Sequence, residues 1–105
     1  MQSISRHDLE NMNEAGIADF VLINVLPREA FNEQHIRTSI NVPHEDQDFE
    51  KTVATLAGDK DRQIVVYCAS FDCDASEKAA RKLDEAGFTR VLDYEGGTED
   101  WLQNH

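Results

Sequence analysis

Short apolar runs separated by helix-like stretches constrain the fold of this chain more than any other feature of its sequence. Residues 20–25 (FVLINV) and 64–67 (IVVY) are almost continuously apolar, which is typical of strands buried on both faces of a sheet. Helix-like segments separate these runs, and parallel strands need crossover connections of this kind. The sequence therefore predicts an α/β fold built on a mainly parallel sheet.

Caps, breakers and periodicity predict the remaining elements. Ser5, with Asp8 three residues later, resembles a capping box at a helix start, and Gly16 is a typical helix stop. Phe49, Val53 and Leu56 fall at helical spacings and should share one helix face. Further predicted elements are a helical turn opened by Pro27, strands at 39–42 and 88–94, a helix at 76–86 closed by Gly87, and a short helix holding Trp101 and Leu102 after a flexible Gly96-Gly97 turn.

Size and charge limit the functions that this chain can have. Its 105 residues suit one compact domain, expected to span 1–105. The formal net charge of −11 disfavours binding to nucleic acid or to an anionic membrane. Two explanations of this charge stay open, a solubilising surface and a docking face for a basic partner protein. The first residues lack a secretory apolar segment and two cysteines are too few for a disulfide scaffold, so we expect a cytoplasmic protein.

Cys68 directly follows the apolar run 64–67, and a helix is predicted to begin eight residues later. A strand, a cysteine, a polar loop and a helix in this order predict an anion-binding nest backed by a helix N-terminus. Such a site favours the thiolate, which is the reactive form of a cysteine. Ligands also bind beyond the carboxyl ends of parallel strands, where Cys68 lies. We therefore expect Cys68 to be an accessible nucleophile, the alternative being a small buried residue that ends a strand.

Several fragments in order resemble the rhodanese (sulfurtransferase) family, and the resemblance covers nearly the whole chain. They are residues 22–25 (LINV), 34–36 (QHI), 40–43 (INVP), 65–68 (VVYC), 76–80 (SEKAA), 86–88 (AGF) and 95–97 (EGG), followed by Trp101. The resemblance implies a central sheet of about five strands flanked by helices on both faces.

The resemblance also implies a chemistry that needs neither a metal nor an organic cofactor. Cys68 would be the catalytic residue, taking sulfane sulfur from a donor as a persulfide and passing it to a thiol or protein acceptor. The loop N–H groups and the helix dipole would stabilise the thiolate. The active-site loop would consist of Ala69, Ser70, Phe71, Asp72, Asp74, Ala75 and Ser76.

The loop departs from the usual family pattern in length and charge. It is two residues longer than is common, and no Arg or Lys stands between Cys68 and Lys78. Asp72 and Asp74 occupy this stretch instead, so we expect poor use of the thiosulfate dianion. A neutral or protein-borne donor is more plausible. The missing arginine also disfavours the phosphate chemistry of related C-x5-R loops.

Asp74 has a second interpretation, as the N-cap of the following helix with Glu77 at the third position. For Asp72 two interpretations stay open, a solvated loop residue and an acid near the sulfur. Ser70 either hydrogen-bonds the sulfur or faces water. Phe71 either shields a persulfide or packs the loop.

Cys73 lies five residues after Cys68, and this spacing suggests an alternative function for the protein. If the loop curls, the two sulfurs can approach disulfide distance. Cys73 would then be a resolving thiol, and the protein a two-cysteine redox or sulfide-releasing protein. A non-catalytic binding module with the same fold is a further alternative.

Upstream residues depart from the family as well. Asn24 stands where the family usually has Asp, and Leu26 where Arg is common. His35 matches a family histidine, and we expect it to form structural hydrogen bonds near a turn. His7 and His44 are expected at the surface.

Overall fold

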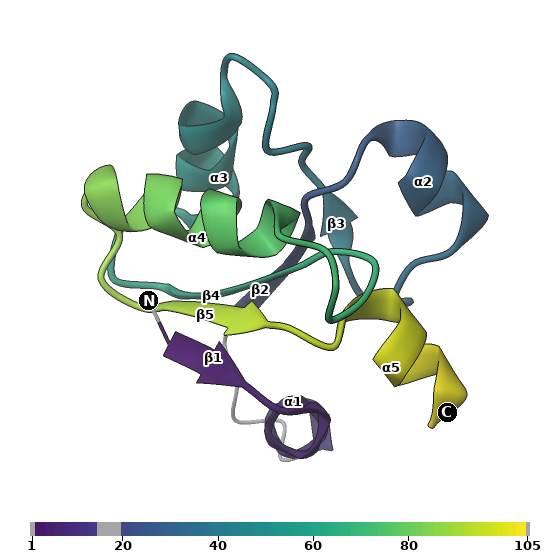
Figure 1. Ribbon diagram of the computed structural model, residues 1–105. Helices are drawn as coiled ribbons and strands as arrows, with labels where there is room; N and C mark the ends of the chain where they lie inside the picture. Colours follow the sequence, from purple (N-terminus) through teal and green to yellow (C-terminus); the bar gives the residue numbers. More distant parts are fainter. Residues whose placement is uncertain (1, 15–19, 105) are drawn as a thin grey trace.

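The computed structural model describes residues 2–14 and 20–104. At its centre is a five-stranded parallel sheet with strand order β1-β5-β4-β2-β3, which confirms the predicted fold class (Figure 1). The strands are β1 (Gln2–Ile4), β2 (Phe20–Asn24), β3 (Ile40–Asn41), β4 (Gln63–Tyr67) and β5 (Val91–Tyr94). The strand that precedes Cys68, β4, therefore lies in the middle of the sheet.

Helices cover both faces of the sheet, as expected. They are α1 (Arg6–Glu14), α2 (Arg28–Glu33), α3 (Phe49–Ala57), α4 (Ala75–Glu85) and α5 (Gly97–Gln103). In Figure 1, α3 and α4 lie on one side of the sheet, and α1 and α5 on the other. Val53 of α3 and Leu83 of α4 belong to one core cluster, whereas Leu9 of α1 belongs to a second, against which Trp101 of α5 packs.

The continuous apolar run of β4 is explained by its two buried faces. Ile64 and Val66 pack into the α3–α4 cluster, while Val65 and Tyr67 pack into the α1–α5 cluster. All four side chains are 0 % exposed. The Tyr67 hydroxyl still has partners, because the Ile36 N–H donates to it at 3.0 Å. Burial on both faces therefore fixes the strand that positions the candidate nucleophile.

Most predicted helix signals are confirmed. The Ser5 Oγ accepts from the Asp8 N–H, and the Asp8 carboxylate accepts from the Ser5 N–H, each at 3.2 Å, so the capping box exists. Phe49 and Val53 of α3 are buried. The predicted stop at Gly16 falls outside the described residues.

The strand predicted at 39–42 is shorter, at Ile40–Asn41, and two further boundaries differ more from the expectations. The strand predicted at 88–94 begins only at Val91, because residues 86–88 complete the turn that ends α4. The predicted turn at Gly96-Gly97 is itself the start of α5, with Gly97 as the first helical residue. Among the residues that the structure describes, no helix has the length and apolar character that crossing a membrane requires.

Candidate active site

Cys68 lies at the carboxyl edge of the sheet, immediately after β4, where ligands bind in folds of this type. The N-terminus of α5 holds the chain here: the Thr98 N–H donates to the Cys68 carbonyl at 3.0 Å, and the Glu99 N–H to the Ala69 carbonyl at 2.9 Å. In a trans peptide the N–H points opposite to the C=O. The amides of Ala69 and Ser70 therefore point away from α5.

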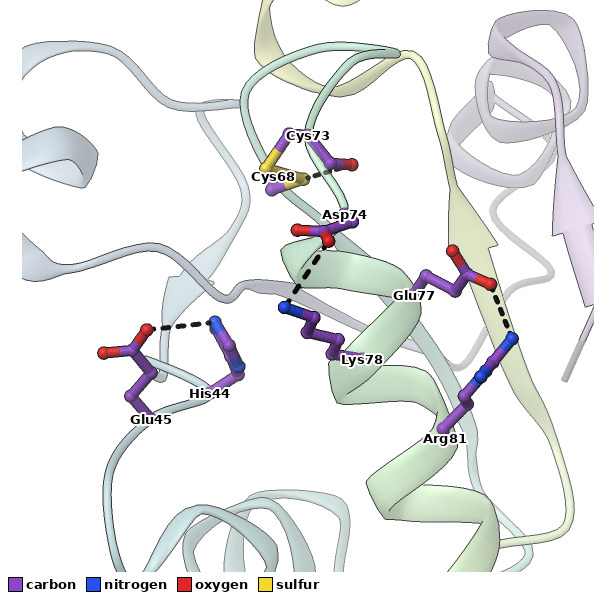
Figure 2. A network of polar contacts seen from close by, with 8 residues as sticks. All are labelled: His44, Glu45, Cys68, Cys73, Asp74, Glu77, Lys78 and Arg81. Carbon is purple, nitrogen blue, oxygen red and sulfur yellow. Dashed lines mark hydrogen bonds and ion pairs between the residues drawn. A yellow bond between two sulfur atoms is a disulfide. The ribbon is translucent and has the colours of Figure 1, made fainter.

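Cys68 and Cys73 form a disulfide, with their Cα atoms 6.4 Å apart (Figure 2). The sequence left open whether these sulfurs meet, and the curled loop brings them together. Cys68 is 1 % exposed, whereas Cys73 is half-buried and lines a surface hollow. The expectation of an accessible Cys68 thiol is therefore wrong for this form of the protein, since its sulfur is both bonded and buried.

The rest of the loop corrects two further expectations. The Cys73 N–H donates to the Ser70 carbonyl at 3.1 Å and closes a turn that presents Phe71 to solvent. Phe71 is 70 % exposed, so it neither shields the sulfur nor packs the loop. Asp74 is the N-cap residue of α4 but makes no capping hydrogen bond. Its exposed carboxylate instead pairs with Lys78 at 3.4 Å, one helical turn away (Figure 2).

Ser76 in the first turn of α4 connects the sulfur to a buried carboxyl group. Its Oγ lies 3.6 Å from the Cys68 Sγ, and its side chain hydrogen-bonds Asp93. Strand register places Asp93 near the sulfur. Asp93 pairs with Val66 of β4, which lies two residues before Cys68, and both side chains face α4. Ser76 and Asp93 are 2 % and 3 % exposed. In the reduced protein, a thiol at Cys68 could donate to Ser76 while the Ser76 hydroxyl donates to Asp93.

Burial raises the pKa of Asp93, and the negative charges of Glu95 and Glu77 add to this, while the hydrogen bond from Ser76 opposes it. The sequence analysis did not single out Asp93. One signal in the sequence could have indicated it: Asp93 is a carboxyl group inside a mainly apolar predicted strand. In the structure that strand, β5, pairs with the strand that precedes the cysteine.

An acidic hollow of about 300 Å³ opens beside the loop, on the side of β5. Its lining includes five carboxyl groups and one sulfur-bearing side chain: Asp72, Asp74, Glu77, Asp93, Glu95 and Cys73. A second hollow of about 410 Å³ lies between α2 and α5 and includes Leu26 and Ala69, but neither cysteine. Of these two hollows, the acidic one is therefore the one that reaches the disulfide, through Cys73. Within residues 2–14 and 20–104, no three His, Cys, Asp or Glu side chains are grouped to hold a metal ion.

The upstream residues have structural roles. Asn24 is fully buried, and its Oδ1 accepts from the Leu26 N–H at 3.0 Å. His35 stacks on Phe31 with ring centroids 3.9 Å apart, and its Nδ1 lies 2.8 Å from the Phe31 carbonyl oxygen, as the structural expectation required.

Of the two histidines expected at the surface, His7 is exposed, but His44 is not, since its side chain retains only 14 % exposure. Burial lowers the pKa of His44, and the nearby Lys82 lowers it further.

A family model described as Rhodanese-like domain matches residues 5–104, nearly the whole chain. The chain belongs to the rhodanese-like family. It is 25 % identical over 113 residues to the thiosulfate:glutathione sulfurtransferase of Saccharomyces cerevisiae, covering 99 % of this chain and 80 % of that enzyme. The crystal structure of the BH2092 protein of Bacillus halodurans superposes with a TM-score of 0.85 at 31 % identity, covering 98 % of this chain and 72 % of the other.

Some relatives are much longer than this rhodanese-like chain. It is 32 % identical over 99 residues to an HTH-type transcriptional regulator of Mycobacterium tuberculosis. The match covers 94 % of this chain but only 41 % of the regulator. The same kind of domain is thus found within larger proteins.

Proposed function

We propose that this protein is a sulfurtransferase that carries sulfane sulfur as a persulfide on Cys68 and delivers it to a thiol or protein acceptor. One observation carries the proposal: within a rhodanese-like fold, the cysteine lies at the carboxyl end of the central strand and at the N-terminus of α4. In the loading step, the Cys68 thiolate attacks the outer sulfur of a donor persulfide R–S–SH. The products are Cys68–S–SH and the thiolate R–S⁻. In the delivery step, an acceptor thiolate attacks the outer sulfur of Cys68–S–SH and releases the Cys68 thiolate.

The charges around the loop favour a donor other than thiosulfate. Asp72 and Asp74 stand in the loop, and no Arg or Lys stands between Cys68 and Lys78. One carboxylate at ~6 Å from a unit negative charge opposes it by roughly 0.7–3 kcal/mol, depending on the effective dielectric. A dianion is opposed about twice as strongly. A persulfide on a small thiol or on a partner protein fits this site better.

The disulfide supports a second candidate function, sulfide release. The Cys73 thiol attacks the inner sulfur of the Cys68 persulfide, so that Cys68–S–SH and Cys73–SH give the Cys68–Cys73 disulfide and H₂S. This step needs no external oxidant, because the persulfide supplies the oxidised sulfur. The curled loop already holds the two residues at bonding distance. Catalysis would then require reduction of the disulfide after each turnover.

Intact mass spectrometry distinguishes these functions. The reduced protein is incubated with glutathione persulfide or with thiosulfate, and its mass is followed over time. We expect one added sulfur from the persulfide, little from thiosulfate, and none in Cys68→Ser.

The Cys73→Ser variant is the matched control. An adduct that lasts longer in this variant than in the wild type, together with sulfide formation by the wild type alone, supports the sulfide-releasing role. Equal lifetimes support simple transfer. If no donor adds sulfur to the wild type, the sulfurtransferase proposal is wrong and a non-catalytic binding module gains support.

A further inference from the structure

The acidic hollow has more negative charge than its surroundings neutralise. Lys78 pairs with Asp74 and Arg81 with Glu77 at 2.8 Å, so two of the five carboxylates have a cation beside them (Figure 2). Asp72 and Glu95 have no ion-pair partner among residues 2–14 and 20–104. A group that enters the hollow therefore meets uncompensated negative charge.

A buried oxygen at the hollow also lacks a hydrogen-bond donor. Asp93 is 3 % exposed, and its Oδ1 has no partner among the described residues, although the Ser76 side chain bonds the same carboxyl group. A buried acceptor without a donor costs free energy, so such groups normally find a partner. Asp93 lines the hollow, so a ligand there can supply the donor. An ammonium or guanidinium group would supply both the hydrogen bond and the opposite charge.

The hollow also determines which sulfur an incoming thiol meets. Cys73 lines it, while Cys68 is 1 % exposed and is not part of the lining. Thiol–disulfide exchange requires access to the sulfur that is attacked. Attack at Cys73 leaves Cys68 as the departing thiolate, which is the species that the proposed sulfur chemistry needs.

We propose that the acidic hollow admits thiols that carry a positive charge near their sulfur, and that such a thiol opens the disulfide at Cys73. In the first step, R–S⁻ bonds to the Cys73 sulfur, the Cys68–Cys73 bond breaks, and Cys68 leaves as a thiolate. A second R–S⁻ attacks the sulfur of R bound to Cys73, giving R–S–S–R and the Cys73 thiolate. The thiol is the reductant in both steps, so no other redox partner is required. The inference deepens the proposed function by naming the thiol that prepares the site, but the exchange is measured without any sulfur donor.

The test compares three thiols of similar size on the oxidised protein: cysteamine (cationic), 2-mercaptoethanol (neutral) and 3-mercaptopropionate (anionic). Concentrations are adjusted to equal thiolate, and each rate is divided by the rate of the same thiol with a small neutral disulfide. We expect the normalised rates to fall in the order cationic, neutral, anionic. Salt at about 0.5 M should compress the differences, because it screens exposed charges. Alkylation and peptide mapping should find the mixed disulfide on Cys73.

Charge-neutralising variants show which carboxylates cause the preference for the cationic thiol. Asp72→Asn and Glu95→Gln should each lower the cysteamine preference about threefold, as one unit charge at ~6 Å implies in a water-like dielectric. Glu29→Gln, an exposed position on α2 outside the hollow, makes the same change in net charge and should leave the preference unchanged. A preference lowered equally by all three variants would point to net charge alone and overturn the inference.

Two short peptides identify the source of the positive charge, one with lysines and one with glutamates on either side of a cysteine. A preference shared by cysteamine and the lysine peptide indicates that small cationic thiols suffice. A preference shown by the lysine peptide alone indicates a basic protein segment. Equal normalised rates for all probes, or a mixed disulfide on Cys68, overturn the inference. Failure of persulfide loading in the mass experiment would leave this result standing, so the two proposals fail separately.

Discussion

At the scale of single residues, Gly97 is constrained by the backbone of the active-site loop. Its φ is +65°, and a Cβ there would overlap the Cys68 carbonyl oxygen and lie 2.8 Å from the Ala69 carbonyl carbon and 2.9 Å from the Ser70 nitrogen. These are backbone atoms of the active-site loop, so they cannot rotate aside as a side chain can. Gly97 therefore allows α5 to approach the loop closely enough to bond its carbonyls.

We predict that Gly97→Ala lowers the free energy of unfolding by at least about 3 kcal/mol, because backbone strain and steric overlap combine. Gly58→Ala is the matched control, since its φ is +89° but nothing lies within 4 Å of the added Cβ. That variant should lose only about 1–2 kcal/mol. Urea unfolding followed by circular dichroism measures both. Equal losses would show that the close approach to the loop has no energetic consequence.

Asp93 gives the stability of the protein a defined dependence on pH. Burial raises its pKa above the ordinary 3.8, so folding favours the protonated carboxyl group. This contribution is fully present below the unfolded pKa and is lost as pH rises through the folded pKa. We predict that Asp93→Asn is close to wild type in stability at low pH and becomes progressively more stable than wild type as pH rises through that range. Urea unfolding at a series of pH values measures the difference, and a difference that stays constant would contradict the explanation.

At the scale of elements, continuous apolar burial is what the sequence predicts best. The runs that form β2 and β4 are recognised because both of their faces are covered. The strand β1 was not predicted: it has three residues, Gln2 and Ser3 are exposed, and only its pairing with β5 makes it a strand. A short edge strand of this kind leaves no apolar pattern to detect.

In the candidate site, too, the sequence predicts the features that depend on local patterning and misses those that depend on tertiary structure. The position of Cys68 follows from the end of β4, which local patterning predicts. The disulfide depends on how the loop curls, and the nearness of Asp93 to the sulfur depends on the register of β4 and β5. Asp74 shows the limit of cap signatures, because the N-cap position was correct while the expected hydrogen bond is absent. Side-chain pairing across elements is set by tertiary structure and cannot be obtained from spacing alone.

The active-site loop should change its redox state without unfolding the domain. Cys68 and Cys73 are five positions apart, so their bond closes a short loop. Loop-closure entropy for such a loop corresponds to about 2 kcal/mol, against roughly 5–15 kcal/mol for a typical domain. We predict that a strong reductant lowers the free energy of unfolding by about this amount and leaves the far-ultraviolet spectrum native. The Cys73→Ser variant should show no response to reductant, and unfolding of the wild type on reduction would contradict the prediction.

At the scale of the whole molecule, a large excess of negative charge is confined to a small volume. The Cα radius of gyration is 12.4 Å and the formal net charge is −11. Charges of one sign at this density repel one another and destabilise the compact state. Salt screens exposed charges over about 10 Å at 0.1 M, a distance comparable to that radius. Repulsion across the molecule should therefore weaken markedly between low and moderate ionic strength.

We predict that the melting temperature rises as NaCl is increased from about 0.01 to 0.5 M, by roughly 4–8 °C for each kcal/mol of repulsion relieved. The control is a variant with exposed carboxylates outside the acidic hollow neutralised, such as Glu29→Gln combined with Asp59→Asn. It should melt higher than wild type at low salt and gain less from added salt, because less repulsion remains to be screened. A melting temperature that stays level or falls with salt would mean that local ion pairs such as Glu77–Arg81 outweigh the net charge.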